Sequence, residues 1–273
     1  MIAIVTDSTA YLTKKRALDA DVRVVPANYV VSGKSFSESY SGNNGDYLSL
    51  LTGAKNLTTS QASVAAFMSV FEELLRNGYQ ILCIVMSSRL SGMYSSASIA
   101  AREVDKENII VVDSLTIAGG MEFLITKARE FIDAGLSLNE VAVAVEKERE
   151  RVGIVFSVDD LEALRRSGRV GHVLHSIGAI LNLRPILVFE DGAVISSDTA
   201  RGTADQIRKL TSKIPDNAKE VTIHYIKEQA HAVTLFYAIR KRFPMVKLKM
   251  VEVGPVLGIH LGLSVIAAAW ITE

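Results

Sequence analysis

Two short hydroxyl-rich segments carry the side chains best suited to chemistry in this chain. Thr58-Thr59-Ser60-Gln61 and Ser87-Ser88-Arg89-Leu90-Ser91-Gly92 each lie between an expected strand and an expected helix. Hydroxyls and free backbone N–H groups at a helix N-terminus can hold an anion. Because the chain has no Walker-type lysine loop, these segments suit a carboxylate as well as a phosphate.

The two segments belong to a series of alternating strands and helices. The apolar runs Ile2–Thr6, Ile81–Met86 and Ile109–Val112 predict strands buried on both faces. The Ser/Gly/Asn-rich stretch from Ser32 to Asp46 is expected to be irregular. Apolar residues at helical spacing from Val64 to Leu75 predict a helix, and Ser63 is its expected N-cap. Repeated strand–helix units predict a parallel sheet with right-handed crossovers.

Ligands of such sheets bind at the carboxyl ends of the strands. We therefore expect both hydroxyl segments, together with Asp113-Ser114, to converge at that edge. A second domain is expected to begin near Val152, because Asp191-Gly192 predicts a two-residue hairpin between Pro185–Glu190 and Ala193–Ser197. The prediction is an α/β protein, with a mostly parallel sheet covered by helices on both faces in residues 1–151. Residues 152–273 are predicted to form an α+β domain with a mixed sheet.

Composition excludes several classes of protein. The chain has 273 residues, 49% of them hydrophobic, and 30 basic residues balance 30 acidic ones, so no nucleic-acid partner is expected. Cys83 lies inside an apolar strand and is predicted to be a core residue in a reducing compartment. Asp7 interrupts the first apolar run, and His260 interrupts the last one. We therefore expect a cytoplasmic protein without stable membrane insertion.

The usual catalytic and metal-binding motifs are missing from the sequence. It contains no G-x-G-x-x-G after a strand, no nucleophile elbow and no H-E-x-x-H. His172 and His175 lie three apart without a carboxylate or cysteine at ligand spacing, so a chance or structural pair is favoured over a metal site. The sequence therefore predicts no catalytic residue, no metal and no cofactor.

Two further features have both a structural and a functional interpretation. His260 lies in the glycine-rich segment Gly254–Gly262, which predicts a loop, and it is either a core histidine or a ligand contact. The basic run Leu164–Arg169 predicts a helix that ends at Gly168, where cations suit the helix dipole. That interpretation accounts for Arg166 and less well for Arg169, which follows the cap.

Seven segments in order along the chain resemble the DegV family, bacterial fatty-acid-binding proteins that present acyl chains to a fatty acid kinase. The matching segments are Val5-Thr6-Asp7-Ser8-Thr9-Ala10, Thr59-Ser60-Gln61-Ala62-Ser63, Ser87-Ser88-Arg89-Leu90-Ser91-Gly92-Met93-Tyr94-Ser95-Ser96-Ala97, Asp113-Ser114, Leu164-Arg165-Arg166-Ser167-Gly168-Arg169-Val170, Leu183-Arg184-Pro185-Ile186-Leu187 and Gly254-Pro255-Val256-Leu257-Gly258-Ile259-His260.

The resemblance implies a long-chain fatty acid held between two domains, and whether the domains exchange some segments is left open. It implies that Thr59 and Ser91 donate hydrogen bonds to the fatty acid carboxylate and that His260 lies beside them. Ser60 and Gly92 belong to the same ligand-binding segments. The resemblance places Arg169 and Arg166 at the head-group entrance, where a separate kinase catalytic subunit would phosphorylate the carboxylate. The chain itself is then a non-catalytic subunit.

The sequence departs from the family pattern in four places. Gly262-Leu263-Ser264 replaces the usual G-P-G, Met93 replaces a threonine and Ala62 replaces a proline. These three changes are expected to alter pocket shape and chain-length preference. Ser196-Ser197-Asp198 stands where a basic residue is common, which weakens the prediction of the usual partner surface.

Two other functions stay open at this point. A serine-dependent hydrolase or phosphotransferase, acting on a small apolar carboxylate or ester, would use Ser91 as nucleophile and His260 as base. Alternatively, the chain binds a different apolar carboxylate or serves only as an interaction module.

Overall fold

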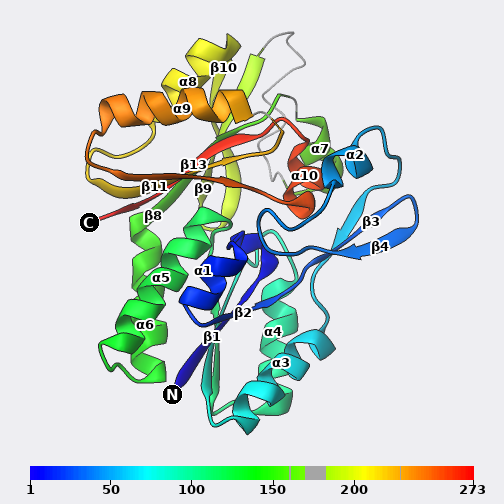
Figure 1. Ribbon diagram of the computed structural model, residues 1–273, viewed down its shortest axis with the longest axis vertical. Helices are drawn as coiled ribbons and strands as arrows, with labels where there is room; N and C mark the ends of the chain where they lie inside the picture. Colours follow the sequence, from blue (N-terminus) through cyan, green and yellow to red (C-terminus); the bar gives the residue numbers. More distant parts are fainter. Residues whose placement is uncertain (160, 170–182, 228) are drawn as a thin grey trace.

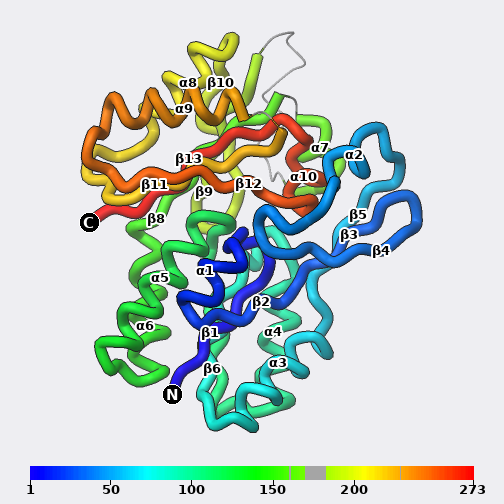
Figure 2. Tube along the Cα trace, viewed as in Figure 1, coloured from blue at the N-terminus to red at the C-terminus, as the bar shows by residue number. Residues whose placement is uncertain are grey.

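The computed structural model describes residues 1–159, 161–169, 183–227 and 229–273. Figures 1 and 2 show the first half of the chain around one sheet and the second half around another, stacked along the long axis of the molecule. His172 and His175 lie outside the described residues. Within the described part of the chain, no helix has the length and apolar character needed to cross a bilayer.

The first sheet is parallel throughout and has the strand order β2-β1-β6-β7. Its strands are β1 (Ile2–Asp7), β2 (Val22–Val25), β6 (Gln80–Val85) and β7 (Ile109–Asp113). Three of them match the apolar runs in the sequence. Cys83 is buried within β6, as predicted. The short strand β2 was not foreseen, because an exposed arginine interrupts its apolar residues.

Helices cover both faces of this sheet, as predicted (Figure 1). They are α1 (Lys14–Asp19), α3 (Val64–Arg76), α4 (Met93–Val104), α5 (Gly119–Asp133) and α6 (Leu138–Glu148). Helix α3 buries Phe67 and Phe71. The Ser63 hydroxyl accepts a hydrogen bond from the Ala66 N–H at 3.2 Å, which confirms the predicted N-cap.

The second sheet is mixed, with the order β10-β9-β8-β13-β11-β12 and one parallel pair, β11 and β12, among the described strands. Its strands are β8 (Val152–Ser157), β9 (Leu183–Glu190), β10 (Ala193–Arg201), β11 (Ala218–Tyr225), β12 (Lys247–Glu252) and β13 (Ile266–Thr272). Helices α8 (Gly202–Ser212) and α9 (Gln229–Arg242) pack on one face, and α5 contacts the strands β8 and β13. The division into domains at residue 152 stays a prediction.

The hairpin predicted at Asp191-Gly192 is confirmed. Both residues have positive φ, 47° and 77°, as a tight hairpin turn between β9 and β10 requires. The hairpin tip reaches the first half of the chain, because the buried Ser87 hydroxyl donates to the Gly192 carbonyl at 2.7 Å.

A small antiparallel sheet, of order β4-β3-β5, corrects two predictions. Its strands are β3 (Asn28–Val31), β4 (Lys34–Ser37) and β5 (Thr58–Ser60). The stretch from Ser32 to Asp46, predicted to be irregular, contains β4, because Ser32 and Gly33 both have positive φ and form a hairpin turn. Thr58–Ser60 is a strand of this sheet, so it does not follow a strand of the parallel sheet.

The glycine-rich segment Gly254–Gly262 forms a helix rather than the predicted loop. Helix α10 (Pro255–Leu261) begins with proline and ends at Gly262, which has φ 81°. Helix α7 (Glu162–Ser167) ends at Gly168 in the left-handed region, as predicted. Helix α10 packs against α7, against α2 (Tyr47–Leu51) and against β3 and β5, so residues from both halves of the chain surround it.

Candidate functional site

A cavity lies where the two sheets meet α10. It contains about 1020 Å³ of space free of protein atoms, a volume that includes its opening to solvent. Most of its wall is apolar. Apolar side chains come from the Met86–Met93 segment, from β8 and from α10, and they include Met86, Leu90, Ile154, Phe156, Leu257 and Leu261.

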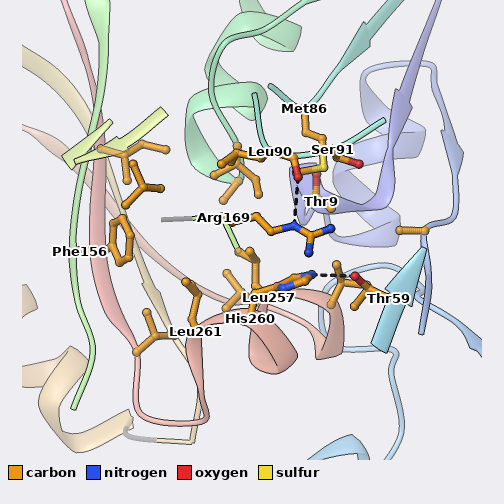
Figure 3. Close-up of a pocket in the computed structure, with 18 of the residues that line it drawn as sticks. Thr9, Thr59, Met86, Leu90, Ser91, Phe156, Arg169, Leu257, His260 and Leu261 are labelled. Atoms are coloured by element: carbon orange, nitrogen blue, oxygen red, sulfur yellow. Dashed lines mark hydrogen bonds between the residues drawn. The ribbon is translucent and has the colours of Figure 1, made fainter. Parts of the chain in front are cut away.

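Polar side chains gather at one end of the cavity (Figure 3). Thr59, Ser91 and His260, which the resemblance implies as the carboxylate site, all line this cavity. The Thr59 hydroxyl oxygen and His260 Nε2 are 2.7 Å apart. The Ser91 hydroxyl accepts from the Met93 N–H at 3.3 Å, so its own hydrogen remains available to a further acceptor.

Arg169 supplies a cation at the same end. Figure 3 shows its guanidinium between Ser91 and His260, and its Nε donates to the Leu90 carbonyl at 3.4 Å. Its side chain is exposed but lines the cavity. Arg166, in contrast, is exposed on α7 and is not part of the cavity wall.

His260 is neutral in this environment. Burial lowers the pKa of its imidazole to about 4, with a further contribution from the Arg169 charge. Its Nδ1 is buried and has no hydrogen-bond partner within the described residues. With the proton on Nε2, the ring donates to Thr59, and the Thr59 hydroxyl can donate to a third group. The site therefore has hydroxyl donors beside one cation, which suits a carboxylate.

The other residues of the two hydroxyl segments differ in position. Ser60 lines the cavity, whereas Gly92 does not. A Cβ on Gly92 would lie 2.8 Å from Gln61 Nε2, so this glycine allows the two segments to approach each other. Gln61 lines the cavity as well, and its amide is a candidate donor that sequence reasoning missed although it belongs to the quoted segment.

His224 is a second histidine on the cavity wall that sequence reasoning missed. Its Nε2 accepts from the Gly119 N–H at 2.9 Å, so Nδ1 carries the proton and donates to the Val251 carbonyl at 3.2 Å. Burial lowers its pKa to about 4. Both nitrogens are thus occupied, and His224 joins β11 to the first turn of α5. No local pattern around it signals this role.

The serine and the histidine of the enzyme hypothesis do not pair in this structure. His260 Nε2 contacts Thr59 rather than Ser91, and Nδ1 contacts no carboxylate among the described residues. The described residues also contain no group of three or more His, Cys, Asp and Glu side chains placed to hold a metal.

Comparison with known proteins identifies the family. The model of the family described as uncharacterised proteins of the DegV family matches residues 1–273. The chain belongs to the DegV family. A DegV domain-containing protein of Halalkalibacterium halodurans is 31% identical over 279 residues, which cover 100% of this chain and 99% of the relative.

Solved DegV structures share the fold over its full length. A fatty-acid-binding DegV family protein from Thermus thermophilus is 28% identical with a TM-score of 0.89, covering 100% of this chain and 99% of that one. DegV of Bacillus subtilis, a fatty acid binding protein, is 27% identical with a TM-score of 0.86 over the same shares. Both the α/β fold and the resemblance predicted from the sequence are confirmed.

The departures from the DegV pattern differ in their relation to the cavity. Met93 lines the cavity, so its side chain forms part of the wall. Ala62 is fully buried but lies outside the lining, and Gly262-Leu263-Ser264 follows α10 without contributing to it.

Proposed function

We propose that this DegV protein binds a long-chain fatty acid, with the acyl chain in the cavity and the carboxylate at its polar end. One observation carries the proposal: an apolar cavity ends in a cluster of Thr59, Ser91, His260 and Arg169. An acyl chain needs apolar surface, and a carboxylate needs donors and positive charge. The fatty acid binding of related DegV proteins supports the same assignment.

Each polar residue has a distinct task in this proposal. Thr59 and Ser91 donate their hydroxyl hydrogens to the carboxylate. His260 donates from Nε2 to Thr59 and so leaves the Thr59 hydrogen free for the ligand. Arg169 opposes the ligand charge. Ser60 and Gln61 complete the rim from the segment that follows Thr59.

We further propose that the protein presents the bound carboxylate to a separate kinase subunit, which forms the acyl phosphate. The polar end of the cavity is the end where Arg169 is exposed, so the head group is the part of the ligand nearest to solvent. Exposed Arg166 on α7 is a candidate contact for that subunit. A cytoplasmic location and a division into domains 1–151 and 152–273 are parts of this proposal.

The first test is mass spectrometry of an organic extract of the purified, untreated protein. The expected result is a near-stoichiometric fatty acid, whose mass gives the preferred chain length. An empty protein that also fails to take up added palmitic acid would overturn the proposal.

The second test places the carboxylate. Thr59→Ala and Ser91→Ala should each weaken palmitic acid binding by about 1.5–3 kcal/mol, the usual contribution of a hydrogen bond to a charged group. Hexadecanol, which lacks the carboxylate, should lose much less affinity. Exposed Thr58→Ala is the matched control. If all variants bind palmitic acid like the wild type, the carboxylate lies elsewhere.

The hydrolase hypothesis predicts a different result. Time-dependent labelling of Ser91 by an organophosphonate would support a nucleophilic serine. The contact of His260 with Thr59 instead of Ser91 predicts that no such labelling occurs.

A further inference from the structure

Glu38 is buried at the first turn of α10, although it lies in a stretch that the sequence predicted to be irregular. Its side chain is 2% exposed. Oε2 accepts a hydrogen bond from the Ser8 hydroxyl at 2.8 Å. Oε1 accepts from the Tyr11 hydroxyl at 3.2 Å and from the Val256 N–H at 2.9 Å. One carboxylate therefore joins the residues that follow β1 to the start of α10.

The hydrogen bonds around Glu38 continue on both sides. The Tyr11 hydroxyl accepts from the Leu257 N–H at 3.3 Å. Ser41 and Tyr47 donate to the main-chain carbonyls of residues 252 and 253, just before α10, at 2.7 and 2.8 Å. Residues 38–47 thus bind successive main-chain groups of residues 252–256, the carbonyls before α10 and an N–H in its first turn.

Helix α10 is the element that carries His260 into the cavity. Val256, whose N–H binds Glu38, and His260 are four positions apart and so lie on the same side of the helix. The approach of Glu38 is close. A Cβ on Gly254 would lie 2.6 Å from its Oε1, so the glycine before α10 makes room for the carboxylate.

We propose that Glu38 is a positioning residue for the carboxylate end of the cavity: by fixing the first turn of α10, it holds His260 against Thr59. The inference rests on the proposed function, because it concerns affinity for the ligand carboxylate. It assigns to Glu38 no contact with the ligand, since Glu38 does not line the cavity.

The ionisable groups that face Glu38 are acidic or phenolic. They are Asp7 at the end of β1, Tyr11, Tyr29 on β3 and Tyr47 on α2. Burial raises the pKa of Glu38 to about 7. The ionised carboxylate can accept all three hydrogen bonds at once, whereas protonation occupies one oxygen with a hydrogen. Above neutral pH these three hydrogen bonds are therefore charge-assisted, although burial of the charge makes the folded protein as a whole less stable there.

The experiment compares wild type with Glu38→Gln by titrating delipidated protein with palmitic acid and with hexadecanol. We expect palmitic acid affinity to fall about tenfold in the variant, and hexadecanol affinity to change by less than about twofold. The difference between wild type and variant should be larger at pH 8 than at pH 6. In a His260→Ala background, Glu38→Gln should have no further effect on palmitic acid, because the residue that it positions is absent.

Glu252→Gln is the matched control. Glu252 also lies just before α10 and shares the Tyr47 hydroxyl hydrogen with the Val253 carbonyl, each at 2.8 Å, but its side chain does not accept from the helix N–H groups. If Glu38→Gln lowers the folding yield, Tyr11→Phe tests the same array by removing one donor to Glu38, with the same direction expected.

Three results would overturn the inference. They are unchanged palmitic acid affinity in Glu38→Gln, an equal loss for acid and alcohol, and a full effect in the His260→Ala background. A wild type that binds palmitic acid no better than hexadecanol would instead overturn the proposed carboxylate site itself.

Discussion

The two hydroxyl segments provide the same kind of donor, but different elements of secondary structure hold them in place. Ser87–Gly92 follows β6 of the parallel sheet, and Ser87 fixes it twice: its N–H donates to the Thr116 carbonyl at 3.0 Å, and its hydroxyl donates to Gly192. Thr59 lies on β5, an outer strand of the small antiparallel sheet, and its hydroxyl contacts His260 from the far end of the chain.

The difference shows which contacts fix the positions of the Ser91 and Thr59 hydroxyls. Ser91 is held through Ser87, which bonds to both halves of the chain. Thr59 is held by the pairing of β5 with β3, and its hydroxyl contacts His260 on α10. A carboxylate between them would join two segments that different elements hold, so changes in β6 and its following segment should differ in effect from changes around α10.

The largest expected effect comes from removing both donors. Thr59 and Ser91 share one partner, the ligand carboxylate, so the losses of Thr59→Ala and Ser91→Ala are coupled, and the double variant should lose more palmitic acid affinity than either single variant, up to about 6 kcal/mol. Titration of the wild type, both single variants and the double variant gives the coupling energy. A double variant no weaker than Ser91→Ala would show that Thr59 does not reach the carboxylate.

The second effect is the pH dependence of stability that arises from Glu38, which binds the first turn of α10. Burial raises the pKa of Glu38 from 4.5 to about 7, so between these values the folded protein holds a proton that the unfolded chain has released. The free energy of unfolding from this group therefore falls as pH rises from about 4.5 to about 7, by up to about 3 kcal/mol. It has no further effect above that range.

Urea unfolding of wild type and Glu38→Gln at several pH values measures this dependence. The stability of the wild type relative to the variant should decrease across that pH range. A constant difference from pH 4 to pH 8 would mean that Glu38 titrates in the folded protein as it does in the unfolded chain.

The third effect concerns the Ser91 support. Ser87→Ala leaves the buried Gly192 carbonyl without its side-chain donor and should lower the free energy of unfolding by about 1–3 kcal/mol. Thr58→Ala, in the exposed part of the other segment, should change it by less than about 0.5 kcal/mol. Equal effects in thermal unfolding would contradict the difference between the two supports.

The smallest effect is expected from the N-cap of α3, which should change stability but not ligand affinity. Ser63 caps this helix four positions after Thr59, so Ser63→Ala should lower stability by about 1 kcal/mol. Palmitic acid affinity should stay within twofold of wild type, because Ser63 does not line the cavity and Thr59 contacts His260 on α10. A tenfold loss of affinity would assign part of the Thr59 support to α3.

The sequence was informative where structure is local. Continuous apolar runs identified β1, β6 and β7, and Asp191-Gly192 identified the hairpin, because each pattern depends only on neighbours in the chain. The segments that converge on the site could be listed from the family resemblance. Their convergence in one cavity is an observation of the structure.

The sequence was less informative where long-range packing decides. Helix α10 was predicted as a loop because the segment is rich in glycine. Pro255 at its first position and Gly262 after its last are typical of helix ends and indicated a helix instead. No local sequence pattern predicted that Glu38, which lies in a polar stretch, would be buried. Its burial depends on Ser8, Tyr11 and Val256, which are distant in sequence, and no periodic pattern contains that information.

The cavity at the junction of the two sheets has a consequence for the energetics of the whole molecule. Strand residues that face it, such as Ile154, Phe156 and Ala267, belong to the same core cluster as the parallel sheet. The cavity is thus an unfilled part of the hydrophobic core. Folding buries most of the apolar surface of this core, and ligand binding buries the part that lines the cavity. Larger apolar side chains on the cavity wall should stabilise the empty protein to the extent that they exclude the guest.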